Sequence, residues 1–381
     1  MASPVDNSKI ITPFIPPLSH IALIQVAVPF FNRFDFRTLK MAFAEIQNGN
    51  SKAPDEGTEE NDNANYDKAK ESLLFIPGLL RERVMEAVAS LRYAVSEWQE
   101  DHSFILGCGF IACTFFMRTD GIIDRTKTAE KLILNKNFNI KKRFHLACMY
   151  CLGDSIRSLW AELEADGRTA SFENTHDPFM RFCIRWIRDG SHIPWTQAVR
   201  EYFTHPRTPS PRASWKRFPR FAYFLPLLRP EERRQFLLSL GTATFDDLLL
   251  SLHTMTKQEE EQVLNTNIRS VLLMYLYTWP LQGLFLETAE KVWNYIDPDT
   301  FRSVLHTILY LKRVRKYPDY CEIFEGFWKM SPEHFREHAK KWPGKEIDSC
   351  LSEIKKRKLS WTNTHQAKKK FISDADCKNV A

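Results

Sequence analysis

The chain has 381 residues, a formal net charge of +6 at pH 7, 44% hydrophobic residues and 26% charged residues. This composition excludes a largely disordered chain, because there are enough apolar side chains to bury a core. The charge is small for this length and does not by itself indicate a nucleic-acid-binding protein.

Eight cysteines lie mostly within apolar runs, and the N-terminal MASPVDNSKI lacks the basic-then-apolar pattern of a signal peptide. Both features favour a reducing, intracellular compartment, either cytoplasmic or nuclear. The longest apolar run, Phe104 to Met117, is shorter than the roughly 20 residues that a membrane-spanning helix needs. We therefore expect a buried core helix there and no membrane span.

The N-terminal region, residues 1–47, is expected to hold an arm and two helices. Its first 17 residues are Pro-rich and favour an extended arm. Leu18 to Phe31 predicts an apolar helix that Pro29 ends or kinks, and Asp35 opens a second helix that runs to Ile46.

Residues 48–67 contain six acids, one base and almost nothing to bury, so we expect an acidic disordered loop. Such a loop can serve as an interaction or modification site, or be a plain solvated insertion between helices.

Residues 68–204 are expected to form a helical domain. Between Leu79 and Trp98, an amphipathic stripe is made by Leu80, Val84, Val88, Leu91 and Val95. The stretch Thr128 to Leu163 then predicts two short apolar helices, joined by a polar turn, and a third helix that begins near Asp154.

Part of this stretch resembles an ankyrin repeat. Phe144-His145-Leu146-Ala147-Cys148, with Ile156 and Leu159-Trp160 downstream, is similar to the LHLAA…V..LLL core of that repeat, and Lys131 to Lys136 is similar to the end of a preceding one. Lys142-Arg143 stand where the repeat has Thr-Pro, and Cys151 stands where it has Gly. The resemblance covers about one repeat, residues 128–163, and implies helix pairs that stack at a period of roughly 33 residues.

Zinc-binding residue types occur at His145, Cys148 and Cys151, and the two cysteines can also be read as a redox dithiol. Three positions at this spacing on one helix span too wide an arc to converge on a metal, and the flanking residues are apolar, so core cysteines beside a hydrogen-bonded histidine are the preferred interpretation. No G-x-S-x-G, P-loop, H-E-x-x-H or G-x-G-x-x-G motif is present. We expect no catalytic residue, no cofactor and no metal ligand.

Asp177-Pro178 predicts the start of a helix that carries Arg181, Arg185 and Arg188, and the next helix begins near Trp195. Arginine and tryptophan are common anchors of protein interfaces, so these four residues are the expected binding anchors. Residues 205–219 follow as a Pro-rich basic connector containing Arg212, Lys216 and Arg217. It can bind or carry phosphate, or simply join two regions rigidly.

Residues 220–352 are expected to form C-terminal helical hairpins. Four segments share one pattern, an apolar helix end followed by a helix start at Pro230, Lys257, Pro298 and Pro332. Thr256, Asp297 and Ser331 occupy the expected capping positions. The pattern is read either as a degenerate repeat or as the caps that any helical protein uses.

The basic tail, residues 353–381, holds two clusters of cations that can act as a nuclear-import signal, bind polyanions, or form a solvated helix end. Their members are Lys355, Lys356, Arg357, Lys358, Lys368, Lys369 and Lys370.

Together these patterns predict an all-α protein of irregular stacked helical hairpins, a degenerate α-solenoid with ankyrin-like repeats. The expected function is a protein–protein interaction scaffold without catalytic activity, whose partner is another protein. Two alternatives remain: a nuclear or nucleic-acid-associated protein that uses the basic loop and tail, and an enzyme of unknown class.

Overall fold

A computed structural model describes residues 9–11, 15–49, 60–107, 115–172, 175, 177–189, 192–204, 221–238, 240–315, 320–341 and 347–356. Within these residues the protein is helical throughout, and the nearest approach to β-structure is a single bridge between Met117 and Ile123. The all-α prediction is therefore confirmed. The chain divides into two compact units, Met1–Leu284 and Phe285–Ala381.

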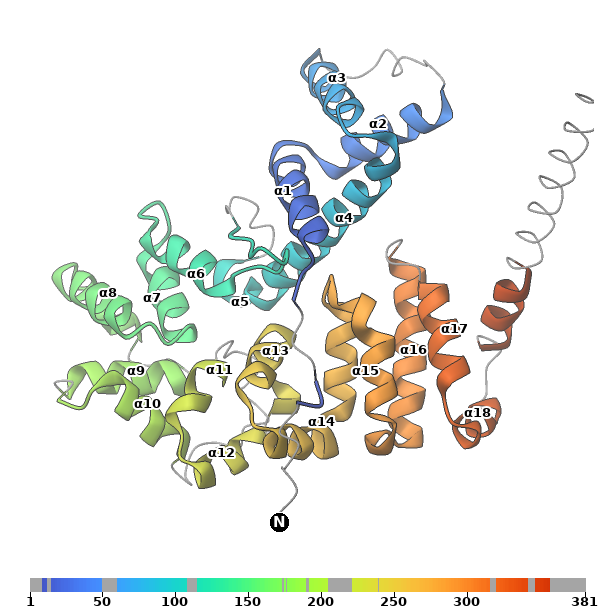
Figure 1. The fold of residues 1–381 in the computed structure, drawn as a ribbon. Coiled ribbons are helices and arrows are strands. Elements are labelled where there is room, and N and C mark those ends of the chain that lie inside the picture. The colour runs from blue at the N-terminus through green and yellow to red at the C-terminus, as the bar shows by residue number, and fades with distance from the viewer. Residues whose placement is uncertain are drawn as a thin grey trace, which may run out of the picture. The chain divides into compact units, whose positions relative to one another are not determined.

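The first unit contains the following helices (Figure 1): α1 (Leu18–Arg33), α2 (Phe36–Asn48), α3 (Glu60–Leu74), α4 (Gly78–Asp101), α5 (Ser103–Leu106), α6 (Arg125–Leu134), α7 (Ile140–Met149), α8 (Gly153–Ala165), α9 (Pro178–Arg188), α10 (Trp195–Thr204), α11 (Phe221–Phe224), α12 (Pro230–Leu237), α13 (Phe245–Thr254) and α14 (Lys257–Tyr277), with short 3₁₀ turns η1 (Thr169–Phe172), η4 (Leu225–Leu227), η5 (Leu240–Thr242) and η6 (Leu281–Leu284).

The second unit is described by α15 (Phe285–Lys291), η7 (Trp293–Tyr295), α16 (Pro298–Val314), α17 (Tyr320–Met330), α18 (Glu333–Lys340) and a helix over 347–356. Its core is aromatic: Phe301 is fully buried, and its ring centre lies 5.2 Å from Phe335 and 5.3 Å from Phe327.

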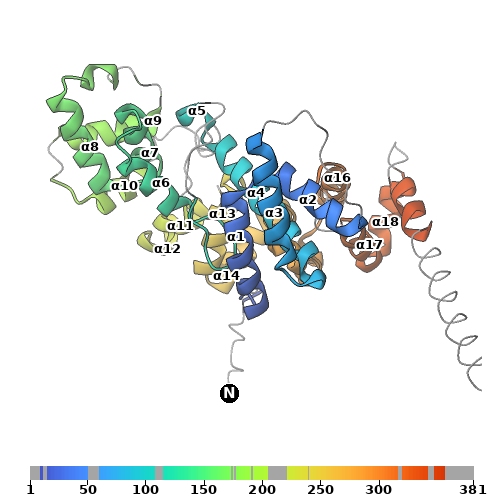
Figure 2. The ribbon, with the colours of Figure 1, turned by 90° about the horizontal axis from the view of Figure 1, so that it is seen from above.

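The helices α1 to α4 bury one apolar cluster, in which α1 lies alongside α4 and α2 alongside α3 (Figures 1 and 2). The Asp35 carboxylate caps α2 by accepting from the amides of Arg37 and Thr38, as predicted. Helix α1 continues past Pro29 to Arg33, so Pro29 does not end it.

Two segments differ from the sequence predictions in this region. Helix α3 begins at Glu60, inside the expected acidic loop of residues 48–67, because Ala69 and Leu73 are fully buried and Lys70 pairs with Glu45 of α2 at 2.7 Å. Residues 50–59 lie outside the described chain. On α4, Leu80 is 43% exposed, so the buried stripe starts one turn later, at Val84.

The expected core helix from Phe104 to Met117 is present only over its first residues, up to Leu106. Helix α5 stops at Leu106, and Gly107 takes a φ of 87°, which halts helical hydrogen bonding. Residues 115–117 are not helical, and Met117 instead forms the bridge to Ile123. Residues 108–114 lie outside the described chain.

The stretch Thr128 to Leu163 forms three helices where the sequence predicts them. The side chains of Asp124 and Asn139 cap α6 and α7, and α7 packs against both α6 and α8. Cys151 closes α7 with a φ of 57°, and the next amide, from Leu152, donates back to the Ala147 carbonyl at 3.0 Å. This hydrogen bond turns the chain sharply into α8.

Three of the helix starts predicted in the C-terminal third, at Pro230, Lys257 and Pro298, are confirmed, and α18 begins one residue after Pro332. Thr256 and Asp297 accept hydrogen bonds from the first-turn amides of α14 and α16. The Ser331 hydroxyl instead donates to the Trp328 carbonyl, so Ser331 does not cap α18. At the start of α12, the Glu232 carboxylate accepts a hydrogen bond from the Arg229 amide at 2.8 Å. This contact stabilises a helix start whose first residue is preceded by Arg229 and not by a usual capping residue.

Candidate interaction surface on α8 and α9

Helix α9 presents three arginines on one exposed stripe. Arg181, Arg185 and Arg188 are spaced i, i+4 and i+7, so they project from the same face, and all three are solvent-exposed. The helix starts where the sequence predicts, because the Asp177 carboxylate accepts from the Met180 amide at 3.1 Å.

The opposite face of α9 is buried and fixes the orientation of the stripe. Cys183 is fully buried, Ile184 and Trp186 are nearly so, and the helix packs against α7 and α8. An amphipathic helix of this kind cannot rotate without exposing its apolar face, so the arginines are held toward solvent.

Two cation–π contacts cross the seam between α8 and α9. The Arg157 guanidinium of α8 lies 4.6 Å from the ring centre of Trp186 on α9, and that of Arg188 on α9 lies 5.5 Å from Trp160 on α8. Such contacts contribute about 0.5–1 kcal/mol each at exposed sites. They also restrict the two guanidinium groups before any partner binds.

Both indole N–H groups at the seam are satisfied internally. Trp160 Nε1 donates to Glu164 Oε1 at 2.7 Å, and Trp186 Nε1 donates to the Ile193 carbonyl at 3.0 Å. Trp160 and Trp186 are 2% and 6% exposed, so the tryptophans are buried beneath the surface and the arginines are its solvent-exposed residues. We call Arg157, Arg181, Arg185 and Arg188 the arginine surface.

Trp195, an expected anchor, is a packing residue instead. It is only 9% exposed, its Nε1 donates to the Cys151 carbonyl at 2.8 Å, and its ring centre lies 4.6 Å from that of Trp186. Its indole also covers Gly153, where an added Cβ would lie 2.7 Å from Trp195 Cγ. Helix α10 begins at Trp195, as the sequence predicts, but the indole faces inward because α10 packs across the turn between α7 and α8.

The remaining predicted site residues belong to the Pro-rich basic connector and to the basic tail. Lys355 and Lys356 are exposed at the end of the helix over 347–356. The others lie outside the described residues: Arg212, Lys216, Arg217, Arg357, Lys358, Lys368, Lys369 and Lys370. Arg157 was not singled out by sequence reasoning, because only the packing of α8 on α9 brings it to Trp186.

The cysteines next to the surface are packed inside it. Cys148, Cys151 and Cys183 are all buried as free thiols. Burial, with a contribution from the Cys148 side chain, raises the pKa of Cys183 well above its usual value, which disfavours the reactive thiolate. Among the described residues, no three His, Cys, Asp or Glu side chains converge to hold a metal ion.

A second polar group lies inside the first unit, around His102 and Tyr150, both fully buried. His102 Nδ1 lies 2.6 Å from the Trp98 carbonyl, which can only accept, so Nδ1 carries the proton. His102 Nε2, 2.8 Å from the Tyr150 hydroxyl, is therefore the acceptor of that O–H. Burial lowers the pKa of His102 to about 3, so it stays neutral. The pair acts as an internal tether between α4 and α7.

Arg125 joins the same region by an ion pair. Its guanidinium donates to Asp101 at 2.6 Å, and its charge partly offsets the rise that burial imposes on the pKa of Asp246 on α13. The charged and polar groups around His102 therefore link α4, α6, α7 and α13.

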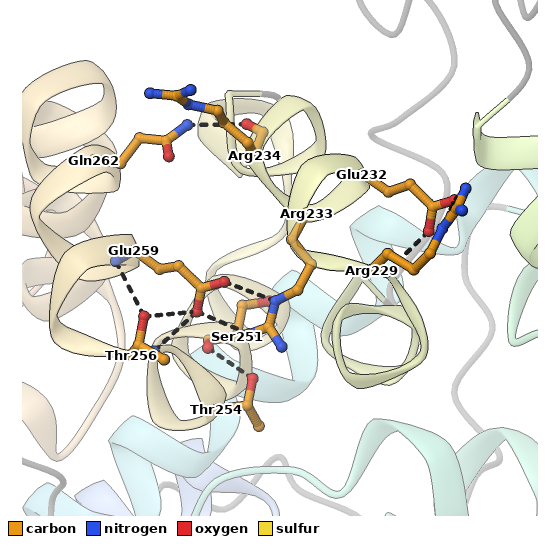
Figure 3. A network of polar contacts seen from close by, with 9 residues as sticks. All are labelled: Arg229, Glu232, Arg233, Arg234, Ser251, Thr254, Thr256, Glu259 and Gln262. Carbon is orange, nitrogen blue, oxygen red and sulfur yellow. Dashed lines mark hydrogen bonds and ion pairs between the residues drawn. The ribbon is translucent and has the colours of Figure 1, made fainter.

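A third polar network joins α12 and α14 (Figure 3). Arg233 Nη2 donates to Glu259 Oε2 at 2.8 Å, and Arg233 Nε lies 2.7 Å from the other oxygen of that carboxylate. Glu259 also accepts from the Thr256 amide at 2.9 Å, completing a capping box at the start of α14. Hydrogen bonds from Arg229 lower the pKa of Glu232 to about 2, so this carboxylate stays ionised. The capping box fixes the start of α14, and the Arg233–Glu259 ion pair joins that start to α12.

Comparison of the chain with family models, with curated proteins and with solved structures finds no match to any of the three. In the part of the chain that the structure describes, no helix combines the length and the apolar character that crossing a membrane requires.

Proposed function

We propose that the protein is an interaction scaffold that binds an acidic segment of a partner protein at the arginine surface. The observation that carries this proposal is the exposed arginine stripe of α9, together with the two guanidinium groups held over buried indoles. Arginine forms bidentate hydrogen bonds with carboxylates, and its prior restriction lowers the entropy lost on binding.

The burial of the tryptophans favours an acidic protein over a nucleic acid. Proteins that bind single strands offer open aromatic faces on which bases stack. At this surface Trp160 and Trp186 are 2% and 6% exposed, so their faces are not open to a base. The exposed guanidinium groups of Arg157 and Arg188, which lie over these indoles, suit carboxylates.

At the level of the fold, we propose stacked helical hairpins of the ankyrin-like kind. The support is that neighbouring helices along the chain pack in pairs, as in α6 with α7, α7 with α8, α13 with α14 and α16 with α17. In a repeat fold each pair contacts its neighbours and leaves one edge for partners. Within the arginine surface, Arg157 lies in the segment that resembles an ankyrin repeat, and the arginines of α9 follow that segment.

The test is charge reversal on α9. We expect the double variant Arg181→Glu, Arg185→Glu to lose acidic partners that the wild-type chain retains from a nuclease-treated cell extract, measured by quantitative mass spectrometry. Binding of a labelled polyglutamate peptide, followed by fluorescence anisotropy, should weaken at least about tenfold, or about 1.4 kcal/mol.

The matched control is Arg37→Glu, Lys40→Glu on α2, which changes the net charge equally at two other exposed cations. This control should keep the same partners and the same peptide affinity, apart from the general effect of charge. An equal loss of partners and of peptide affinity in both double variants would contradict the proposal. It would also be contradicted if the wild-type chain retained partners only from an extract that had not been treated with nuclease.

A further inference from the structure

A short N-terminal segment, Lys9 to Ile11, is held against the corner between α13 and α14. The Lys9 Nζ donates to the carbonyls of His253 at 2.6 Å and Leu252 at 3.3 Å. These carbonyls belong to the last turn of α13, which lacks helical donors and carries the negative end of the helix dipole. A lysine ammonium suits both properties.

The backbone of the same segment is recognised by a buried acid. Glu260, on the first turns of α14, is fully buried, and its Oε2 accepts from the Ile10 amide at 2.9 Å. Burial raises the pKa of Glu260, and the backbone amides of Ile10 and Ile11 partly offset this rise. The other oxygen of this carboxylate, Glu260 Oε1, has no hydrogen-bond partner among the described residues.

The third contact is apolar: the Ile11 side chain is only 3% exposed. The segment therefore presents a cation to a helix end, one backbone donor to a buried carboxylate, and an aliphatic side chain to the core. Buried carboxylates destabilise a fold unless they are hydrogen-bonded, so Glu260 is better explained as an acceptor for peptide amides than as a packing residue.

The start of α14, next to the segment, has stabilising contacts of its own. Thr256 and Glu259 form the capping box of α14, and Arg233 of α12 holds the Glu259 carboxylate (Figure 3). Because these contacts involve none of residues 9–11, we expect the corner to keep its shape when the segment leaves, as a binding site requires.

We propose that the α13–α14 corner is a peptide-binding site for segments of the type Lys-aliphatic-aliphatic, and that Lys9 to Ile11 occupies it in cis. The site is independent of the arginine surface and selects a different chemistry. The site recognises three groups of its ligand: one lysine ammonium, one backbone amide and one aliphatic side chain that becomes buried. A partner segment of the same chemistry competes with the chain's own segment, whose tether gives it an effective concentration of roughly millimolar.

The test uses the full chain with its own segment disabled by Lys9→Glu, Ile11→Asp. We expect a fluorescent peptide of residues 6–15 to bind this variant saturably in an anisotropy titration. Binding to the wild-type chain should be at least about tenfold weaker, because the site is already filled.

Changes in the peptide keep the test independent of protein folding. A peptide with N-methylated Ile10 cannot donate to Glu260, and one with norleucine in place of Lys9 cannot bond to the end of α13. Each should bind the disabled chain at least about tenfold less tightly, a loss of about 1.4 kcal/mol. Absence of binding by the unmodified peptide, or equal binding by the N-methylated one, would overturn the proposal.

Discussion

Single residues decide how closely the helices around the arginine surface pack. Gly153 lies under the Trp195 indole, where an added Cβ would approach Trp195 Cγ to 2.7 Å and Cδ1 to 2.8 Å. We expect Gly153→Ala to destabilise the first unit by about 1–3 kcal/mol, because the buried indole must move. Urea denaturation measures this loss. Gly283→Ala, with no heavy atom within 4 Å of the added carbon, is the control and should change stability little.

The buried His102 makes stability depend on pH. In the folded chain its pKa is lowered to about 3 from the ordinary 6.5. Between these values the unfolded chain binds the proton and the folded chain does not, so stability falls as the pH drops through this window. The contribution is at most about 1.4 kcal/mol per pH unit.

We expect His102→Gln to flatten the dependence of the unfolding temperature on pH in that window, as followed by calorimetry. His192→Gln, at an exposed histidine in the same unit, is the control and should leave the dependence as it is. If the His102 variant and the wild-type chain show the same slope, the buried neutral histidine does not contribute as proposed.

At the scale of elements, capping residues set where the helices start. The Thr256 hydroxyl accepts from the Glu259 amide at the first turn of α14. Thr256→Ala should lower stability by about 1 kcal/mol, measured by urea denaturation. Thr266→Ala, at an exposed position within the same helix, should stay within about 0.5 kcal/mol of the wild type. A smaller loss for Thr256 than for Thr266 would show that the capping box is not the stabilising feature.

Sequence reasoning worked best for elements with such caps. Asp35, Asp177, Thr256 and Asp297 mark helix starts that the structure has, because a cap acts through atoms within one turn of itself. It failed at Gly107 and at residues 115–117, because an apolar run predicts burial but does not by itself distinguish a helix from other buried backbone.

At the scale of the whole molecule, the chain has two compact units, each with its own buried residues. We expect more than one transition in calorimetric unfolding, since separate cores unfold separately unless a large interface couples them. Phe301→Ala empties a fully buried position in the second unit and should cost that unit about 3–5 kcal/mol.

The transition that Gly153→Ala lowers should therefore stay in place in the Phe301→Ala variant. A single transition, shifted to the same extent by either substitution, would contradict this independence.

The sequence by itself determined the helical class, most helix starts and the exposed arginine stripe of α9. These features depend on residue spacing and on capping residues within a few positions, and both can be read from the sequence. The tertiary structure decided which aromatic residues remain accessible and which distant residues meet. It buries Trp195, brings Arg157 to Trp186, and joins Lys9 to the end of α13. The residues in these contacts are separated by between 9 and 244 positions in the sequence, and no local pattern specifies how their helices pack.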